Sequence, residues 1–264
     1  MTRASADVAV IGGSGFYEFL DDPEEQLVET PYGAPSAPVS VGTVSGRRMA
    51  FLPRHGRGHE HPPHRINYRA NLWALRSLGV RQVLAPCAVG GLRDEVAPGD
   101  VVVPDQLVDR TVGRDGTYVE TGAVHAPFAD PYCPRLSAAV AGVDHRVRVG
   151  GTMVVIEGPR FSSRAESQHY AAQGWSLVNM TGAPEAALAR ELGQCYAAIA
   201  LVCDMDAGVE AGGGVGQREV FALFAANLTR LRTLLTDAVA ALPDPDGCAC
   251  SSWADGITLT YEVP

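Results

Sequence analysis

The sequence predicts an α/β fold in which a mixed, mainly parallel twisted sheet carries helices on both faces. Three observations indicate this class: short apolar runs alternate with helical patterns, several of these runs are apolar on both faces, and Gly- or Pro-marked turns separate them. No internal repeat and no low-complexity linker divides the chain. We therefore expect a single domain over residues 1–264, with a divergent tail from about residue 243.

The expected elements follow from hydrophobic periodicity and from turn residues. Strands are expected at 8–11, 49–52, 83–85, 101–103, 153–156, 177–180 and 196–202, and a short last strand could form at 257–261. Helices are expected at 67–78, 163–173, 185–192 and 217–242, with a Gly-rich loop at 211–214 and a surface excursion at 111–145. The run 196–202 is the most continuously apolar of these and should be the central strand.

The composition indicates a globular, acidic protein. Hydrophobic residues make up 46% of the 264 residues and charged residues 19%, which supplies a core and excludes a disordered chain. The formal net charge of -9 argues against nucleic-acid binding by general attraction. No stretch approaches the ~18 consecutive apolar residues of a membrane span, and the first residues lack signal-peptide features. We expect a cytoplasmic protein with no membrane association.

The six cysteines suggest buried thiols in a chain of this length. Cys248 and Cys250 are the exception, because only one residue separates them. That gap is too short for the usual zinc-knuckle spacing. The pair could be two free thiols on the tail or a strained, reducible disulfide.

Two turns that follow expected strands carry groups suited to an anion. The glycine turn 12–15 offers backbone N–H groups and the Ser14 hydroxyl, which could cradle an anion or form a plain turn. It does not match the G-x-G-x-x-G pattern of dinucleotide-binding folds. Arg54 offers a forked cation and His55 a ring donor, at the start of a cluster of arginines and histidines. This cluster is a natural phosphate site, whereas a metal site would need a carboxylate pattern that is missing.

Two carboxylates follow the expected central strand. Asp204 and Asp206 are two residues apart, so in an extended chain both would face one side. In a semi-buried site their repulsion and desolvation would raise the pKa of at least one, which makes it a plausible proton donor near neutral pH. An exposed acidic turn or a helix cap is the alternative.

The arrangement of these turns predicts an enzyme. Turns at 12–15, 53–56, 86–91 and 203–206 each follow an expected strand, so they would meet at one edge of the sheet. Oxyanion donors and paired acids would then face each other. Such a layout suits a reaction in which phosphate is the nucleophile and an acid assists the leaving group.

Eight strings of the sequence resemble the trimeric purine nucleoside phosphorylase family, and specifically its methylthioadenosine phosphorylase branch. They are IGGSG (11–15), TPYGAPS (30–36), PRHGRGH (53–59), INYRANLWAL (66–75), PGDVVVPDQLVDRT (98–111), GTMVVIEGPRFSSRAES (151–167), NMTGAPEAALARELG (179–193) and DMD (204–206). The resemblance implies phosphorolysis of 5'-methylthioadenosine to adenine and 5-methylthioribose 1-phosphate. It also implies a homotrimer or dimer of trimers, phosphate as co-substrate, and no metal or organic cofactor.

The resemblance also implies roles for individual residues. The implied phosphate site consists of Ser14, Arg54, His55, Cys87, Ala88 and Thr181. The implied substrate contacts are Phe161 and Ser162 at the base, Met180 at the ribose, and Gln217, Val220 and Phe221. Asp204 matches the acid that donates to purine N7, and Asp206 the group beside the 6-amino substituent. His125 matches a residue that reaches the 5' end of the substrate across the subunit interface.

Three departures from the family pattern bear on substrate. Cys87 stands where most relatives have Thr, and Gln217 stands where the branch usually has an apolar Val near the methylthio group. A polar amide there could favour a 5'-hydroxyl or another polar 5' group. The tail follows the usual pattern poorly, and its CxC resembles one that forms a disulfide in some thermophilic members.

Other functions are compatible with parts of this pattern. The runner-up is a phosphorylase acting on methylthioinosine, adenosine or other 6-oxo- or 6-aminopurine nucleosides; the acid pair argues against the 6-oxopurines. A hydrolytic nucleosidase would not need the Arg54–His55 oxyanion site. A nucleoside-binding module without activity would not need the acids.

Overall fold

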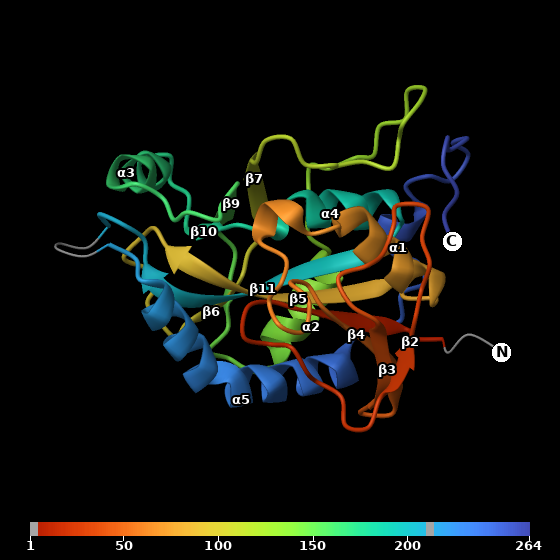
Figure 1. The fold of residues 1–264 in the computed structure, drawn as a ribbon, viewed down its shortest axis with the longest axis horizontal. Helices are drawn as coiled ribbons and strands as arrows, with labels where there is room; N and C mark the ends of the chain where they lie inside the picture. Colours follow the sequence, from red (N-terminus) through yellow and green to blue (C-terminus); the bar gives the residue numbers. More distant parts are fainter. Residues whose placement is uncertain (1–4, 210–213) are drawn as a thin grey trace.

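A computed structural model describes residues 5–209 and 214–264, and within these ranges the strands form one eleven-stranded mixed sheet. Helices cover both faces of this sheet (Figure 1). The predicted fold class is confirmed. No helix among the described residues is long and apolar enough to cross a membrane.

The sheet is mixed, and most neighbouring strands in it are parallel. Their bounds are β1 (Val8–Gly12), β2 (Glu24–Gln26), β3 (Val39–Val44), β4 (Arg47–Pro53), β5 (Gln82–Gly91), β6 (Val101–Val103), β7 (Gln106–Arg110), β8 (Arg148–Val149), β9 (Thr152–Ile156), β10 (Leu177–Asn179) and β11 (Cys195–Met205). One path runs β2-β3-β4-β1-β5-β10-β9-β7, and β11 joins β5 to β6, which pairs with β8. The pairs β1–β4, β1–β5 and β5–β11 are parallel, whereas the pairs β2–β3, β3–β4, β5–β10 and β6–β11 are antiparallel.

Two helices pack on each face of the central strands. The helices are α1 (Tyr68–Ser77), α2 (Pro134–Val143), α3 (Arg164–Ala172), α4 (Gly182–Glu191), α5 (Gln217–Ala241) and the short α6 (Ala249–Ser252), with a 3-10 turn at Pro63–Arg65. Along β11, side chains alternate between a core under α1 and α4 and a core over α2 and α5. Because both faces are covered, β11 is apolar from Cys195 to Cys203, as expected for a central strand.

Strand β5 gives the sheet a gap in which a ligand can be held. It pairs with β11 along its length, with β1 only at residues 82–84, and with β10 only at 90–91. Between these two contacts the edge of β5 is left to side chains. The carboxyl ends of β1 and β4 and the end of β10 surround this gap.

The structure corrects the expected turn at 86–91. These residues continue β5, and Cys203–Met205 likewise continue β11 with a bulge after Val202. Gly90 is a strand residue that leaves room for its neighbours: a Cβ there would lie 2.9 Å from Val178 and 3.1 Å from an Asp204 carboxyl oxygen. The turns at 12–15 and 53–56 form as predicted.

Two further expectations are revised, and a third lies mostly outside the described residues. The surface excursion holds for residues 111–133, but α2 occupies 134–143 because Leu136 and Val140 pack into the core. Residues 257–261 form no strand, since the tail reaches no free sheet edge. Of the expected glycine loop, residues 211–213 lie outside the described part of the chain.

Candidate active site

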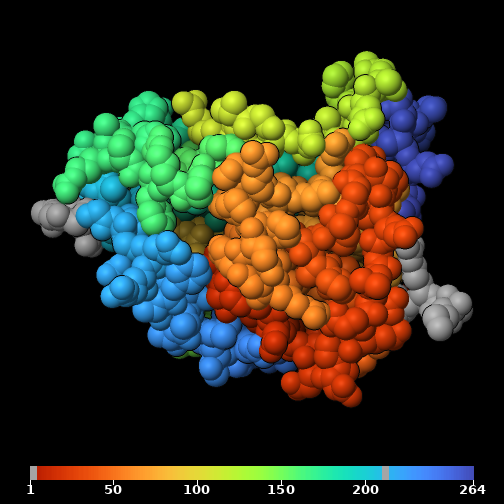
Figure 2. Space-filling model, in the orientation of Figure 1, coloured from red at the N-terminus to blue at the C-terminus, as the bar shows by residue number. Residues whose placement is uncertain are grey.

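A cavity of about 340 Å³ opens at the carboxyl ends of β1, β4, β5 and β11. Figure 2 shows this face hollowed between the green segment that carries α3 and the orange segment that follows β4. The predicted phosphate residues all line it: Ser14, Arg54, His55, Cys87, Ala88 and Thr181. The predicted substrate residues that line it are Phe161, Ser162, Met180, Asp204, Asp206, Gln217, Val220 and Phe221.

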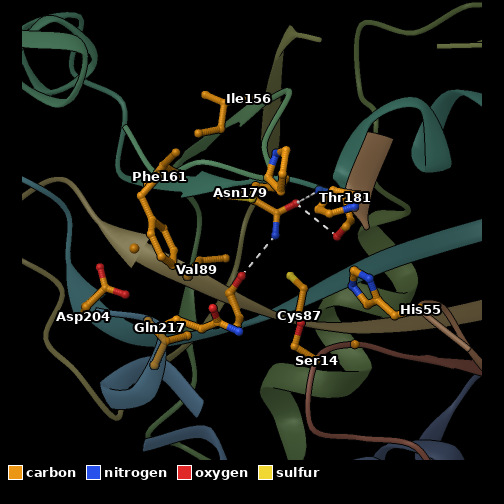
Figure 3. Close-up of a pocket in the computed structure, with 18 of the residues that line it drawn as sticks. Ser14, His55, Cys87, Val89, Ile156, Phe161, Asn179, Thr181, Asp204 and Gln217 are labelled. Atoms are coloured by element: carbon orange, nitrogen blue, oxygen red, sulfur yellow. Dashed lines mark hydrogen bonds between the residues drawn. The ribbon is translucent and has the colours of Figure 1, made fainter. Parts of the chain in front are cut away.

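The two groups lie at opposite ends of the cavity. In Figure 3, Ser14, His55, Cys87 and Thr181 gather at one end, while Asp204 and Phe161 lie at the other. The cavity therefore has a polar end suited to an anion and an end where an aromatic ring faces a carboxyl group.

Arg54 is the fixed positive charge of the polar end. It is 1% exposed, and its Nε and Nη2 donate to the two carboxylate oxygens of Glu185 at 2.7 and 2.8 Å, while Nη1 donates to the Pro86 carbonyl at 3.2 Å. Burial lowers the pKa of Arg54, but the Glu185 carboxylate outweighs burial and the net pKa is raised. These three bonds leave two of the five guanidinium hydrogens, one on each Nη atom, for an anion.

Glu185 holds this arginine in place and was not singled out from the sequence. It is 0% exposed and also accepts a hydrogen bond from the Tyr196 hydroxyl at 2.7 Å. It lies in α4, one residue after Pro184, whose peptide bond with Ala183 is cis. The buried carboxylate thus accepts three hydrogen bonds, two from Arg54 just after β4 and one from β11.

His55 lies at the polar end with one ring nitrogen already bonded. Its Nδ1 donates to the His61 carbonyl at 2.8 Å, and burial lowers its pKa to about 3. In the neutral ring, Nε2 is a hydrogen-bond acceptor that suits an oxygen carrying a hydrogen. That His55 donates to an anion stays a prediction. The His59 ring stacks on the His55 ring at 4.3 Å.

Asn179 connects β5 to the start of α4 across the gap in the sheet. Its Oδ1 accepts from the backbone N–H groups of Thr181 and Gly182, both at 2.7 Å, and its Nδ2 donates to the Ala88 carbonyl at 3.1 Å (Figure 3). This side chain fixes the start of α4 against β5. The Thr181 hydroxyl is thereby held on the cavity wall.

The free edge of β5 adds a backbone donor. The carbonyls of Pro86 and Ala88 accept from side chains in the gap, and in a strand the N–H of a residue points to the same side as its carbonyl. The Ala88 N–H therefore faces the cavity. Burial raises the pKa of Cys87 to about 12, so its thiol stays protonated and is no nucleophile.

Asp204 is the titrating group of the opposite end. Burial, reinforced by the charge of Asp206, raises its pKa to about 7. Its Oδ1 is buried and has no hydrogen-bond partner among the described residues. A carboxyl group that holds its proton near neutral pH and faces a cavity is equipped to act as a general acid.

Asp206 is held more firmly than Asp204. It is 3% exposed, one carboxylate oxygen accepts from the Ser167 hydroxyl at 2.5 Å, and its backbone N–H donates to Gly91 at 2.9 Å. The other face of this end is Phe161 and Ser162, in the loop before α3. The Ser162 hydroxyl is buried without a partner among the described residues, so it is available to a ligand.

The first turns of α5 close the remaining side of the cavity. Gln217, Val220 and Phe221 line it, and Phe221 contacts the His59 ring edge-on at 5.8 Å. An amide, a β-branched residue and an aromatic ring thus surround one part of the ligand space. This side is mainly apolar with a single amide.

His125 is the predicted site residue that the structure does not bring to the cavity. It is exposed on the segment 111–133, which rises above the body of the molecule in Figure 1. The residues that sequence reasoning missed are His59, Glu185 and Asn179. All three lie within the quoted strings, but nothing in the spacing showed that they contact site residues.

No group of potential metal ligands lies in the cavity within the described part of the chain. The histidines that follow Arg54 are not gathered around one point. The thiols of Cys133, Cys195, Cys248 and Cys250 are gathered, but none of them lines the cavity.

Comparisons with known proteins show to which family the chain belongs. The model of the phosphorylase superfamily matches residues 7–242. The S-methyl-5'-thioadenosine phosphorylase of Mycolicibacterium smegmatis is 58% identical and the purine nucleoside phosphorylase of Streptomyces coelicolor 57%; each comparison covers 97% of this chain and 99% of the relative. A methylthioadenosine phosphorylase structure from an antarctic soil metagenomic library covers 98% of this chain and 94% of its own, with a TM-score of 0.88 and 37% identity.

The chain therefore belongs to the phosphorylase superfamily, and it is a pentosyltransferase enzyme. The relatives do not agree on substrate, because two of nearly equal identity bear different names. The geometry of the cavity therefore has to indicate which nucleoside is the substrate.

Proposed function

We propose that this enzyme cleaves 5'-methylthioadenosine with inorganic phosphate, giving adenine and 5-methylthioribose 1-phosphate in purine and methionine salvage. One observation carries the proposal: Asp204, with a pKa of about 7 and an unpartnered oxygen, shares a cavity with the anion-binding groups around Arg54. Two relatives that bear the name methylthioadenosine phosphorylase support the substrate.

Phosphate would occupy the polar end. The free hydrogens of Arg54 and the hydroxyls of Ser14 and Thr181 would donate to its oxygens, together with the Ala88 N–H. Neutral His55 would accept the phosphate's own hydroxyl hydrogen at Nε2. The dianion would thus be oriented by donors on several sides and one acceptor, with no metal or organic cofactor in the proposed reaction.

The purine would occupy the opposite end. A phosphate oxygen attacks C1', the C1'–N9 bond breaks, and its electron pair passes into the purine ring. The Asp204 proton moves to N7, so the leaving base departs neutral and Asp204 becomes a carboxylate that takes a new proton from water. Asp206 would accept a hydrogen bond from the 6-amino group, which a 6-oxopurine cannot supply.

Gln217 favours a second candidate substrate. Its amide lies in the mainly apolar wall formed by Val220 and Phe221, where a methylthio group would otherwise meet only carbon. A 5'-hydroxyl could bond to that amide. Adenosine is therefore the alternative substrate of the same reaction, and a relative named purine nucleoside phosphorylase supports it.

A product assay tests these alternatives directly. Purified enzyme is given methylthioadenosine, adenosine, methylthioinosine or inosine, each with and without phosphate, and the free base is separated and measured. We expect cleavage of the 6-amino nucleosides only with phosphate. Cleavage without phosphate would identify a hydrolase instead, and a preference for inosine would contradict the role given to Asp206.

The proposed assembly is a homotrimer, or a dimer of trimers, in which His125 completes a neighbour's cavity. Its exposure on the projecting 111–133 segment, away from its own cavity, supports contribution to another subunit. We also propose a cytoplasmic location, where the six buried free thiols would remain reduced.

Mixing two inactive variants tests the shared site. Asp204→Asn and His125→Ala subunits are unfolded and refolded together; hybrid trimers should regain activity because some cavities receive both native groups. Each variant refolded alone is the control. Mixtures no more active than the controls would contradict a shared cavity.

A further inference from the structure

We propose that Cys133, Cys195, Cys248 and Cys250 form a structural Zn²⁺ site that fastens the C-terminal tail to the central strand. Their four Sγ atoms lie within 4.8 Å of one another, and all four residues are buried. The sequence predicts no metal site here, because the two thiols of the tail are half of a ligand set and have an unusual spacing. The fold supplies the other two from positions far along the chain.

The sulfur geometry suits a single tetrahedral ion. A Zn–S bond of about 2.3 Å places tetrahedral sulfurs about 3.8 Å apart. Cys133 and Cys248 have sulfurs 3.7 Å apart, and the remaining pairs would close by at most an ångström around an ion. Four thiols and no carboxylate or imidazole are the donor set that zinc prefers in structural sites.

Backbone contacts hold each thiol in this cluster. The N–H of Cys133 donates to the Tyr196 carbonyl, and that of Cys195 to the Arg81 carbonyl, both at 2.8 Å. On the tail, the Ser251 N–H and hydroxyl both donate to the Cys248 carbonyl, at 3.0 and 2.9 Å. This turn brings both tail thiols to the same side. The site is thus built from a loop, a strand end and a turn.

The surroundings can carry the charge of such a site. Four thiolates around Zn²⁺ leave two negative charges, and Arg190 is close enough to Cys250 to act on it electrostatically. Cys133 is the N-cap residue of α2, where the helix dipole favours negative charge.

An ion would add to the contacts that already hold the tail, in which Tyr261 packs on the core and donates to a backbone carbonyl. After α5 ends, the described tail contains only the four-residue helix α6. Arg135 donates to the carbonyls of Asp244 and Asp246, and Arg81 pairs with Asp246 at the surface. Such exposed contacts stabilise little. Binding an ion that bridges the tail and β11 would stabilise the folded state outright, since the unfolded chain has no preformed site.

Metal content is the first test. The protein is expressed with zinc, purified under reductant without chelator, and measured by plasma mass spectrometry. We expect one zinc per chain, lost in Cys248→Ser and Cys250→Ser. The matched control is Cys203→Ser, a buried cysteine outside the cluster, which should retain the metal. Loss of zinc in the control as well would overturn the assignment.

A measurement on the unaltered protein covers the case in which the variants do not fold. Apoprotein is titrated with Co²⁺ under reductant without oxygen; we expect the intense visible bands of tetrahedral cobalt thiolate and a rise in Tm on adding Zn²⁺. Six reactive thiols with no metal uptake, a stoichiometric iron content, or a disulfide protein that binds no zinc after reduction would each overturn the proposal.

Discussion

The two ends of the cavity hold their ionisable groups in opposite ways: one group is enclosed by partners, and the other has an oxygen without one. At the polar end, Arg54 is enclosed by Glu185 and Pro86, and Glu185 is in turn bonded to Tyr196. At the opposite end, a carboxyl oxygen of Asp204 has no partner among the described residues. One end has a charge that cannot change, and the other a proton that can leave.

This difference follows from what each end would do. A guanidinium that orients phosphate has to remain charged in every step, and a buried carboxylate partner ensures this. A general acid has to lose its proton during the reaction, so stabilising either form by a strong partner would impair it. Burial, reinforced by the charge of Asp206, raises the pKa of Asp204 without fixing its protonation state.

The largest expected effect concerns the enclosed charge. Glu185→Gln keeps the shape of the side chain but leaves Arg54 buried without its counter-charge, so we expect a loss of about 3–5 kcal/mol in the free energy of unfolding. Urea denaturation measures it. Glu95→Gln, which breaks the exposed Arg93–Glu95 pair, is the control and should leave the urea midpoint unchanged. Equal effects of the two changes would mean that the buried pair is not essential.

Replacing the proton donor comes next. Asp204→Asn should lower kcat by about 100-fold, because an amide cannot transfer a proton to N7. Steady-state kinetics with methylthioadenosine measure the loss, and a Tm no lower than that of the unaltered protein verifies the fold. Asp105→Asn, an exposed carboxylate outside the cavity, should have no effect. An unaltered kcat in Asp204→Asn would show that this acid is misassigned.

The pH dependence should report the same group. Because the pKa of Asp204 is raised to about 7, the protonated fraction falls above that pH, and kcat/KM should fall about tenfold per pH unit. The free energy of unfolding should also fall as pH rises. Between the ordinary pKa of 3.8 and about 7, the folded state keeps a proton that the unfolded state loses. Stability from this group therefore declines as pH rises through that window. A profile flat to pH 9 would contradict the assignment.

The smallest expected effect concerns the cavity wall formed by the first turns of α5. Gln217→Val removes the amide, so the ratio of kcat/KM for methylthioadenosine to that for adenosine should rise by roughly tenfold. Parallel assays with both nucleosides measure the ratio. Arg218→Ala alters the neighbouring exposed residue and should leave it unchanged. A ratio unaffected by Gln217→Val would place the 5' group elsewhere.

Much of the fold could be predicted because periodicity reports burial. The run 196–202 was apolar on both faces, and the structure covers both faces of β11. The turn expected at 86–91 failed for a physical reason: Pro86 and Gly90 usually end strands, but Pro86 lies where β5 has no strand partner on one side. A single sequence does not show which strand edge is unpaired.

The site was predictable where chemistry determines residue type and less so where packing does. Asp204 and Asp206 were found from their spacing after a strand, and both line the cavity. Glu185 and Asn179 were missed because their partners are remote in the sequence. The Nδ1 bond of His55 to the His61 backbone carbonyl could not be predicted either, because no motif reveals it.

The positions of Asp204 and Asp206 depend on Gly90, which an inventory of charged groups would overlook. Its missing side chain leaves bare backbone under Asp204, Asp206 and Val178, and any Cβ would press on all three. A methyl group added there would displace the proton donor from the base without altering one polar atom. A survey of sequence variants that considers only Asp204 and Asp206 would wrongly judge the site of such a variant to be complete.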